Sequence, residues 1–600
     1  MNRSQTFGRQ DTREGQPTGL PKVVIIALFV WLTAVSFITT GYRHIYGSNH
    51  PYQLVLVQKI NDPTLYPNDA FADTVWYYAS AFWYVVALLS RLVDLSVVLL
   101  LFFIVNKFLF LFAGLRLARA FFPHSQYAPV IGMTTLATFP QLLFGDGYLT
   151  DSTQQTTFAI AFTLLAISDF LDRKWISFAF WLGMALNSNL MFAAYGISYL
   201  ISSWLVYFLR DSSLVSFYKI LASFLGGLLI GAPGIFLVFR ATMDADYDAT
   251  AVWKTVELTF PTHFYPQLWE VHHQLLALML ASSVIFVVYR FRDITPVGIH
   301  LAVWSIVALG WYLLGRINIF WIHSTLLLHL HPVRALTVWQ LSAMVFLATF
   351  IVYHTQLTTT MSVVSLWGRA VALTSVALLD DILDHILSIV PLATSVAVCE
   401  IGRRVISRVG INSYATILTL SILSVISINS VGIFLIGSNI GRKTMVYFKL
   451  DEPAIHIAEW AKRNTSRESV FLIPIHNAGG WSRFRHLSQR NVFVTLKDGT
   501  AWSYAPWFAD EWLRRIKALG LYESLGLDEK SFKIGDWLGV YTQDAKYYID
   551  AYDKVDEKKV EALRRLYKID YWITRATVKT RYPKVYEHSG WQVLRVNDSM

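Results

Sequence analysis

The distribution of polarity along the chain constrains its fold more than any other feature. Residues 23–437 form a succession of long apolar stretches separated by short polar loops, whereas residues 438–600 have the composition of a water-soluble domain. Charged residues make up 15% of the chain, well below the ~25% that is usual in soluble domains. We therefore predict an α-helical polytopic membrane bundle, of about 11–13 transmembrane helices, followed by a C-terminal extracytoplasmic α/β domain.

Candidate transmembrane spans follow from the rule that a span needs about 20 apolar residues. Residues 1–22 are polar and are predicted to form a disordered cytoplasmic tail. The apolar run after them is too long for a signal-peptide core, so it is interpreted as an uncleaved first span. The membrane domain is predicted to comprise residues 23–437, with spans at 23–40, 94–115, 126–143, 154–171, 175–191, 193–209, 218–239, 275–290, 298–314, 335–354, 370–386, 387–402 and 413–436.

Basic residues in alternate loops predict the orientation of the bundle, because cytoplasmic loops carry an excess of Lys and Arg. The residues that fit one cytoplasmic face are Arg116, Arg119, Arg173, Lys174, Arg290, Arg292, Arg403, Arg404 and Arg408. This orientation places the C-terminal domain outside, together with the long loops 41–93, 144–153, 240–274 and 315–334. We expect a multi-pass integral protein of the bacterial plasma membrane.

The charge and cysteine content exclude some classes of partner. The net charge of +10 is assigned to the cytoplasmic loops and to anionic membrane lipid. No Lys/Arg run interleaved with aromatic residues indicates a nucleic-acid groove. Cys399 is the only cysteine, so no disulfide can form within the chain.

The first outer loop, residues 41–93, is the richest in residues that could carry chemistry. Residues 51–60 and 76–93 are predicted to be amphipathic helices lying at the membrane interface. Between and before them, Asp69, Asp62 and His50 could serve as general bases on a lipid-linked substrate. The alternative is that Asp62 and Asp69 only cap turns, which their Pro-rich surroundings also favour.

Arg334 lies at the outer mouth of a predicted span. A guanidinium in this place can bind a phosphate or pyrophosphate through two donors, although an arginine that extends to the lipid headgroups is an equally good interpretation. The histidines of the outer loops could form a divalent metal site, but no tight ligand motif supports one and no cofactor is predicted. These histidines are His263, His272, His273, His323, His329 and His331.

Other polar residues of the outer loops complete the predicted substrate-binding set. Asp146 lies in a Gly-Asp-Gly turn, where a purely structural role is as good an interpretation. In the C-terminal domain, Trp and Tyr beside Arg in 479–485 and 502–507 suit sugar rings, and core packing is the alternative. The predicted substrate-binding residues are Arg334, Arg43, Asn49, Gln53, Asp146 and Arg316.

The C-terminal domain, residues 438–600, has the pattern of alternating helix and strand. Helices are predicted at residues 454–463, 509–519 and 560–567. Strands are predicted at residues 469–473, 491–496, 571–574 and 591–596.

Three segments resemble known membrane enzymes. They are residues 46–53 (YGSNHPYQ), residues 62–69 (DPTLYPND), and residues 484–490 (FRHLSQR) followed by Lys497-Asp498. With the plan of one span, a long outer loop, further spans and an outer domain, they resemble the GT-C superfamily of polytopic glycosyltransferases. This family includes protein O-mannosyltransferases and lipid A aminoarabinose transferases, and the resemblance is closest to uncharacterised bacterial members.

The resemblance implies transfer of a sugar from a polyprenyl-phosphate donor, with inversion, to a glycan, lipid or protein acceptor. It implies a first-loop aspartate as base and basic residues on the lipid phosphate. Better-known members carry an Asp-Glu pair directly after the first span, where this chain reads Asn49-His50. We predict Asp69 as base, with His50 assisting or replacing it, and Arg334 on the phosphate.

Three other functions remain open. A transporter or flippase of lipid-linked glycans is disfavoured by the large outer domain, and by the lack of Gly/Pro-interrupted spans in matching halves. A glycan polymerase or ligase would also use outer-loop Arg and His. A non-catalytic membrane assembly protein is the last alternative.

Overall fold

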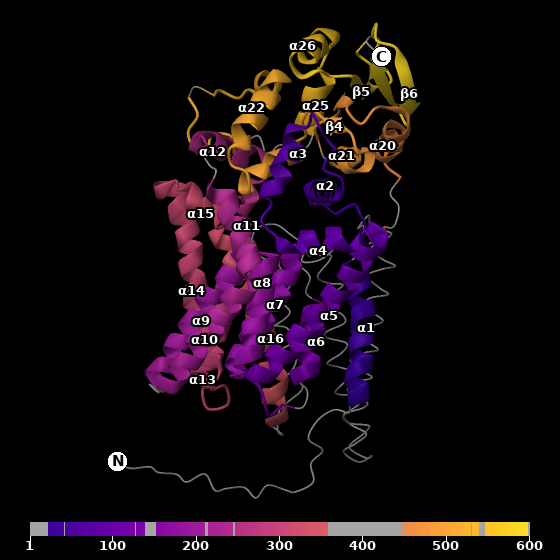
Figure 1. Ribbon diagram of the computed structural model, residues 1–600. Coiled ribbons are helices and arrows are strands. Elements are labelled where there is room, and N and C mark those ends of the chain that lie inside the picture. Colours follow the sequence, from indigo (N-terminus) through magenta and orange to yellow (C-terminus); the bar gives the residue numbers. More distant parts are fainter. Residues whose placement is uncertain are drawn as a thin grey trace, which may run out of the picture.

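The computed structural model shows a helical bundle with a mixed α/β domain stacked on one end (Figure 1). The residues that it describes are 22–40, 42–47, 49–125, 128–138, 152–210, 214–243, 246–269, 271–357, 446–447, 451–476, 478–529, 531–538 and 546–597. The predicted tail 1–22, apart from Lys22, and the predicted spans 370–386, 387–402 and 413–436 lie outside these residues, as does the predicted domain boundary at 437–438.

The bundle consists of apolar helices whose bounds match most of the predicted spans closely, but the span predicted at 218–239 is two helices separated by a bend. The helices of the bundle are α1 (Lys22–Thr40), α5 (Leu95–Phe121), α6 (Ala128–Thr138), α7 (Gln155–Leu171), α8 (Trp175–Ser188), α9 (Leu190–Arg210), α10 (Leu214–Ile230), α11 (Ala232–Met243), α13 (Val271–Arg290), α14 (Gly298–Ile317) and α16 (Leu336–Leu357).

Length and apolar composition make this an integral membrane protein. Within the described part of the chain, four helical stretches are long and apolar enough to cross a membrane, or up to five if the bent pair of α10 and α11 is one span. The bend between these two helices is 62°, and it falls at Gly231-Ala232-Pro233, where proline cannot continue the hydrogen-bond ladder. Shorter apolar helices, such as α7, complete the bundle.

Two glycines allow α5 and α6 to approach each other closely. A Cβ on Gly114 of α5 would lie 2.3 Å from the carbonyl oxygen of Gly132 on α6, and a Cβ on Gly132 would lie 2.0 Å from that of Gly114. Small residues at such crossings let two backbones approach in lipid, where packing rather than water exclusion drives association. Any larger residue at either position would force α5 and α6 apart.

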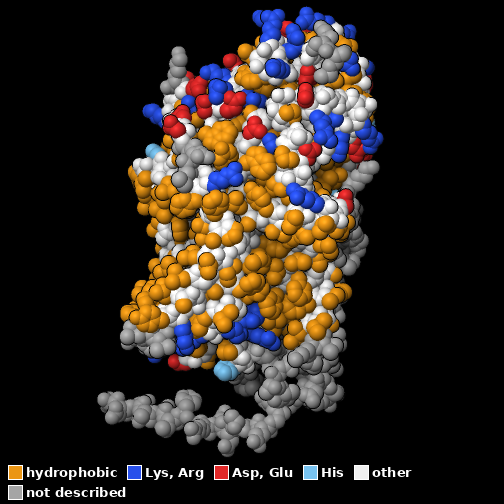
Figure 2. All heavy atoms as spheres, in the orientation of Figure 1, with side chains coloured by type: hydrophobic (Ala, Val, Ile, Leu, Met, Phe, Trp, Pro, Cys, Tyr) orange, Lys and Arg blue, Asp and Glu red, His pale blue; other side chains and the backbone are white. Residues whose placement is uncertain are grey.

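The surface has three zones along the long axis of the molecule. A broad hydrophobic band covers the bundle, mixed charges cover the C-terminal domain, and basic side chains gather at the opposite end (Figure 2). At that opposite end, Arg116 of α5 forms ion pairs with Asp169 of α7 and, at 3.4 Å, with Asp172. This distribution favours a cytoplasmic location for the basic end.

The orientation can be tested with two single cysteines in a Cys399→Ser background. Asp293→Cys lies in the exposed turn between α13 and α14, and Lys558→Cys lies on the surface of the C-terminal domain. A membrane-impermeant maleimide added to intact cells, or to spheroplasts if an outer membrane blocks it, should label Lys558→Cys and leave Asp293→Cys unlabelled until lysis. The reverse result, or labelling of both before lysis, would contradict the predicted topology.

The first loop forms a layer between the bundle and the C-terminal domain. It contains β1 (Tyr42–Arg43), α2 (His50–Asn61), α3 (Ala70–Thr74), η1 (Val75–Tyr77) and α4 (Ala81–Leu89). The prediction of a helix at 51–60 is confirmed by α2, which starts with Pro51 in its first turn. The predicted helix at 76–93 is shorter, because the chain turns through Ser80 and again after Leu89. Helix α4 lies across the top of the bundle (Figure 1).

The other two long outer loops that the structure describes also pack against the C-terminal domain. The loop after α11 contains α12 (Ala249–Thr259), η2 (Pro261–His263) and η3 (Pro266–Leu268). The carboxylate of Glu257 on α12 accepts hydrogen bonds from the backbone N–H groups of Gly535 and Trp537, at 2.5 and 2.9 Å. The loop before α16 contains η4 (Asn318–Ile322), α15 (Thr325–His329) and η5 (Pro332–Ala335).

The C-terminal domain is built on a five-stranded mixed sheet in the order β4-β3-β5-β7-β6. The strands are β3 (Val470–Leu472), β4 (Asn491–Val492), β5 (Tyr571–Arg575), β6 (Lys584–His588) and β7 (Trp591–Arg595). Strand β3 pairs in parallel with β4 and β5, and β7 pairs antiparallel with β5 and β6. The predicted strand at 491–496 is only two residues long, because the chain leaves the sheet and begins η7 at Leu496.

The helices of this domain are α20 (Pro453–Asn464), α21 (Phe484–Ser488), α22 (Phe508–Ala518), α23 (Leu521–Leu525), α25 (Lys546–Asp553) and α26 (Glu557–Tyr567), with the 3₁₀ helices η6 (Ala478–Arg483) and η7 (Leu496–Ser503). The three helices predicted for this domain are confirmed by α20, α22 and α26, and the structure adds shorter ones that were not predicted. One more short strand, β2 (Val446–Tyr447), pairs in parallel with β1 and joins the first loop to the segment entering this domain.

Candidate functional site

A buried ion-pair network joins the first loop to the C-terminal domain. The guanidinium of Arg485 on α21 donates from Nε to Oδ2 of Asp69, at 2.6 Å, and from Nη1 and Nη2 to the two oxygens of Asp498, at 2.7 and 2.8 Å. All three side chains are at most 2% exposed. Burial lowers the pKa of Arg485, but the carboxylates of Asp498 and Asp69 raise it more. We call Asp69, Arg485 and Asp498 the buried triad.

Asp69 is fully engaged within this triad. Its Oδ1 accepts from the backbone N–H of Ala72, which caps α3, and its Oδ2 also accepts from Val492 N–H at 2.8 Å. With Arg485, these are three hydrogen-bond donors to the carboxylate of Asp69, and they leave little of it available to take a proton from a substrate. The contacts therefore favour a structural role for Asp69, and its predicted role as base stays a prediction.

Asp498 fixes the start of η7. Its carboxylate accepts from the backbone N–H and the hydroxyl of Thr495, and the Thr495 hydroxyl accepts from the backbone N–H of Asp498. This reciprocal arrangement is a capping box, which sets the direction of the first helical turn. Lys497 lies within that turn, so its direction is set by the residues that hold Asp498.

Lys497 points from the C-terminal domain toward the first outer loop and the loop after α11. Its ammonium donates to Oδ1 of Asn49 at 3.1 Å and lies 5.8 Å from the ring centroid of Tyr52 and 5.7 Å from that of Phe260. Burial, and then the positive charge of Arg334, lower the pKa of Lys497 from 10.5 to about 8. Among the described residues its partners are an amide and aromatic faces, with no carboxylate paired to it.

Arg334 enters the same region from the bundle. It lies in η5, directly before α16. Its Nη2 donates a hydrogen bond to Nδ1 of the His263 imidazole, at 2.9 Å. His331, the residue just before this turn, has a left-handed backbone conformation with φ 43°. Residues other than glycine rarely adopt this conformation. The His331 ring stacks on Trp502 of the C-terminal domain, with centroids 6.0 Å apart and planes 6° from parallel.

These residues form one group, which we call the cationic cluster: Asn49, Tyr52, His263, Arg334 and Lys497. Each of the five side chains is partly exposed, unlike the buried triad directly behind Lys497. Two cations held together without a paired carboxylate on Lys497 repel each other, and each loses hydration on burial. Such an arrangement is favourable when an anion binds between the cations, as phosphates do at Arg and Lys.

Two predicted residues lie beside the cluster in structural roles. The Nδ1 of His50 accepts from Gly47 N–H at 3.0 Å, so its Nε2 carries the proton and donates to the carbonyl of Thr153 at 3.2 Å. Gln53 donates to Gln155 at 2.9 Å and to the Tyr78 hydroxyl at 3.4 Å. Both side chains are fully buried, and these contacts favour positioning roles over the predicted base and substrate-binding roles.

The remaining predicted residues lie apart from the cluster or outside the description. Asp62 is exposed, accepts from Thr64, and pairs with Arg467 at 3.0 Å; these hydrogen bonds lower the pKa of Asp62. Arg43 lies in β1. Arg316 on α14 donates to the Tyr312 hydroxyl at 3.3 Å and lies over Phe320. Asp146 lies outside the described residues, so its predicted role stays a prediction.

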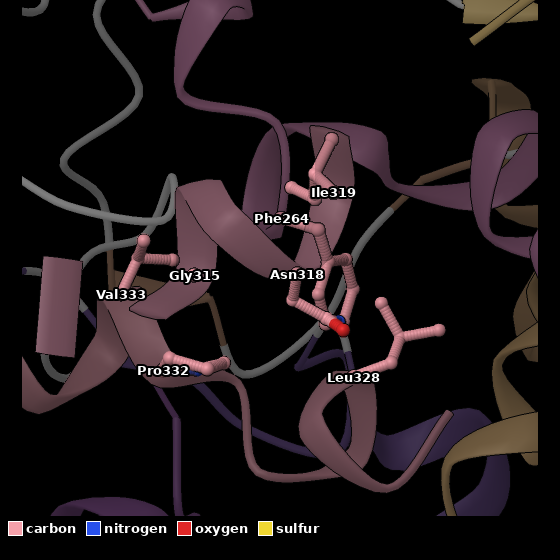
Figure 3. Close-up of a pocket in the computed structure, with 7 residues that line it drawn as sticks. All are labelled: Phe264, Gly315, Asn318, Ile319, Leu328, Pro332 and Val333. Atoms are coloured by element: carbon pink, nitrogen blue, oxygen red, sulfur yellow. The ribbon is translucent and has the colours of Figure 1, made fainter. Parts of the chain in front are cut away.

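A small pocket lies next to the cluster, beneath η5 (Figure 3). Its cavity volume is about 10 Å³, roughly the room that one water molecule needs, and it is lined by Phe264, Gly315, Asn318, Ile319, Leu328, Pro332 and Val333. Ligand pockets are commonly ~300–1,000 Å³. The amide of Asn318 is already bonded to the backbone of Ser324, so the pocket offers neither the room nor the polar groups for a sugar.

His329 and His331, unlike His263, pack against the C-terminal domain. His329 accepts or donates at both ring nitrogens, 2.7 Å from the Thr325 carbonyl oxygen and 3.3 Å from that of Trp502. In the described part of the chain, no group of three or more His, Cys, Asp or Glu side chains is arranged to hold a metal ion. The side chains of His272 and His273 are outside the description.

The sequence did not predict Lys497 or Tyr52 as members of the site, and it indicated His263 only as a possible metal ligand. They come from three segments that are far apart in the chain, and each has an ordinary local context. The capping pattern Thr495-x-x-Asp498 around Lys497 was the available signal, since it indicates a helix start that would orient the lysine. Only Arg334 and Asn49 of the cluster were predicted.

Comparisons with known proteins give a match of part of the chain to one family, and distant structural neighbours. A family described as "Domain of unknown function (DUF6798)" matches residues 452–519, which include Arg485, Lys497 and Asp498. No curated protein matches the chain.

Two of the structural neighbours are structures of an archaeal enzyme. The oligosaccharyltransferase AglB from Archaeoglobus fulgidus, in complex with an inhibitory peptide and a dolichol-phosphate, is 11% identical, with 92% of this chain and 69% of that chain covered and a TM-score of 0.42. The Archaeoglobus fulgidus oligosaccharyltransferase in complex with Zn and sulfate is 11% identical, with 92% and 68% covered and a TM-score of 0.35. At these TM-scores neither similarity assigns a function to this chain.

Proposed function

We propose that the protein is a membrane glycosyltransferase that takes a sugar from a polyprenyl-phosphate donor, and that the cationic cluster binds the donor phosphate. The observation that carries the proposal is the convergence of Lys497 and Arg334. One comes from the C-terminal domain and the other from the mouth of a bundle helix. A phosphate held there would lie at the junction between lipid and the polar domain, where a lipid-linked phosphate is presented.

The chemistry of sugar transfer explains why two cations suit this site. An acceptor oxygen attacks the anomeric carbon and loses its proton to a base, while the bond from that carbon to the phosphate oxygen breaks. The phosphate leaves with the bonding electrons, so a singly charged diester becomes a doubly charged monoester. Cations that face the phosphate stabilise this extra charge more in the transition state than in the ground state, which lowers the barrier.

The base that takes the proton from the acceptor is a residue outside the cationic cluster. Asp69 and His50 remain the residues predicted for this role, although their contacts favour structural roles. The acceptor would be a glycan, lipid or protein on the same side as the C-terminal domain. A flippase, a polymerase or ligase, or an assembly protein would give no transfer from a polyprenyl-phosphate monosaccharide, so a transfer assay distinguishes these alternatives.

Binding of polyprenyl phosphate is expected to weaken as the pH rises through about 8. Below this value Lys497 is protonated and attracts the phosphate, and above it the lysine becomes neutral. The second ionisation of the phosphate, near a pKa of about 6, is complete before this window and does not obscure the change. Binding to the purified protein in nanodiscs can be measured by native mass spectrometry.

The matched control is Lys497→Arg, since arginine stays charged at every accessible pH. This variant should bind with no loss of affinity between pH values of about 7 and 9.5, the window around the Lys497 pKa. The same pH-dependent loss in Lys497→Arg and in the wild type would show that Lys497 is not the titrating group. A wild type that binds no polyprenyl phosphate at any pH would contradict the proposed function itself.

A further inference from the structure

We propose that Arg485 is a positioning residue for the cationic cluster: it holds Lys497 in the direction needed to bind the donor phosphate, without contacting the phosphate itself. This proposal rests on the proposed function, because it names a residue that acts on the same phosphate site. Arg485 is 1% exposed, so any effect on a bound lipid must pass through its neighbours.

The path from Arg485 to Lys497 is short and made of hydrogen bonds. Arg485 binds both oxygens of Asp498, and Asp498 forms the capping box with Thr495. Lys497 lies between these two capping residues in the chain. If Arg485 no longer holds Asp498, the first turn of η7 loses the carboxylate that orders it, and the lysine loses its fixed direction.

The first loop supports Lys497 from two sides. Asp69 binds Nε of Arg485 at 2.6 Å, behind the lysine, and Asn49 accepts from the ammonium of Lys497 at 3.1 Å, in front of it. Residues of the first loop therefore hold Arg485 at one end of this hydrogen-bonded path and Lys497 at the other. This arrangement couples the docking of the C-terminal domain on the first loop to the completion of the phosphate site.

Arginine is required at this position because of its geometry. Nη1 and Nη2 of its planar guanidinium donate two parallel hydrogen bonds to the oxygens of Asp498, and Nε donates a third to Asp69. Lysine carries the same charge on a single point and cannot meet both carboxylates in these directions. Arg485→Lys therefore keeps the net charge of the buried triad and removes the geometry.

The experiment measures polyprenyl phosphate binding by the full-length protein in nanodiscs, per folded molecule, with thermal stability measured in parallel. Arg485→Lys is expected to bind at least tenfold more weakly than the wild type. In a Lys497→Gln background it should cause no further loss, because the lysine it positions is already absent. Wild-type affinity in Arg485→Lys, or an equal additional loss in both backgrounds, would overturn the proposal.

Arg490→Lys is the matched control. Arg490 is also buried, and its guanidinium donates to the carbonyls of Lys462 and Thr465, at 2.7 and 2.6 Å, away from η7. It should lower thermal stability and leave binding per folded molecule unchanged. If Arg490→Lys weakens binding as much as Arg485→Lys, the effect is a general loss of domain structure and the positioning role is overturned.

Thr495→Val keeps the proposal testable if Arg485→Lys does not fold. Valine has nearly the shape of threonine and removes only the hydroxyl of the capping box. A threefold to tenfold loss of binding is expected, again absent in the Lys497→Gln background. Wild-type affinity in Thr495→Val would overturn the positioning role. The proposed function fails separately, if the wild type does not bind polyprenyl phosphate or Lys497→Gln binds it as well as the wild type.

Discussion

Replacement of Lys497 by methionine should abolish most sugar transfer while making the protein more stable. The loss expected is about 10²–10³-fold, the usual effect of removing one group that stabilises charge in a transition state. Arg334→Ala should have a loss of similar size, and Arg334→Lys a smaller one, because lysine keeps the charge but not the fork. The assay is transfer from a panel of radiolabelled polyprenyl-phosphate sugars to acceptors in membranes that contain each variant.

The gain in stability distinguishes this result from misfolding. The pKa of Lys497 is lower in the folded protein than the ordinary value of 10.5, so the unfolded chain binds the proton more strongly. Below pH 8 the charged lysine therefore costs stability, on the order of 1–2 kcal/mol for a partly exposed side chain. Lys497→Met should recover this stability at pH 7, and its advantage over the wild type should shrink as the pH rises from 8 toward 10.5.

Lys254→Met is the control for burial of a lysine at the same junction. Lys254 lies on α12, 3.7 Å from the carboxylate of Glu529 and over the rings of Phe532 and Trp537, apart from the cationic cluster. Its replacement should leave transfer within about twofold of the wild type, since it faces no site for charge development. Full transfer activity in Lys497→Met would remove the phosphate role from Lys497.

Asp69→Asn is expected to lower the free energy of unfolding by about 3 kcal/mol, because a buried ion pair loses one partner. Arg485 would keep Asp498 but lose the acceptor at Nε, and Val492 N–H would lose a charged acceptor. The transfer rate per folded molecule should fall by less than about tenfold. If Asp69 is instead the base, the same variant should retain its thermal midpoint and lose about 10²–10⁴-fold in rate.

Asp62→Asn serves as the comparison for this measurement. Asp62 is exposed and its partners are Thr64 and the solvent-exposed Arg467. Neither thermal stability nor transfer should change measurably in this variant, since exposed ion pairs contribute little. A stable, inactive Asp69→Asn would restore the base assignment made from the sequence, and an inactive Asp62→Asn would contradict both interpretations.

The bundle could be predicted from the sequence because its signal is local. Apolar runs near 95–121 and 190–210 are long enough to identify as spans without knowledge of their neighbours. Three helices of the C-terminal domain, α20, α22 and α26, were also predicted, since their apolar residues repeat at helical spacing. The strand β6 was missed because none of its residues is buried and they lack the alternation that marks a half-buried strand.

The site could be predicted only in part because it depends on long-range pairing. Arg334 has a recognisable position before a span, and Asp69 lies in a loop rich in turn residues. Nothing near Asp69 indicates that Arg485 will occupy its carboxylate, since the two are 416 residues apart. The same separation hides Lys497, whose value as a phosphate ligand depends on Asn49 and Arg334 reaching it from other segments.

The most direct test of the proposed function is an electron cryo-microscopy structure of the full-length protein in nanodiscs with polyprenyl phosphate. The cationic cluster predicts a phosphate within hydrogen-bonding distance of both Lys497 Nζ and the Arg334 guanidinium, with the prenyl chain leaving toward the hydrophobic band of the bundle. A phosphate bound elsewhere, with Lys497 and Arg334 unchanged, would contradict the phosphate site and the glycosyltransferase mechanism built on it.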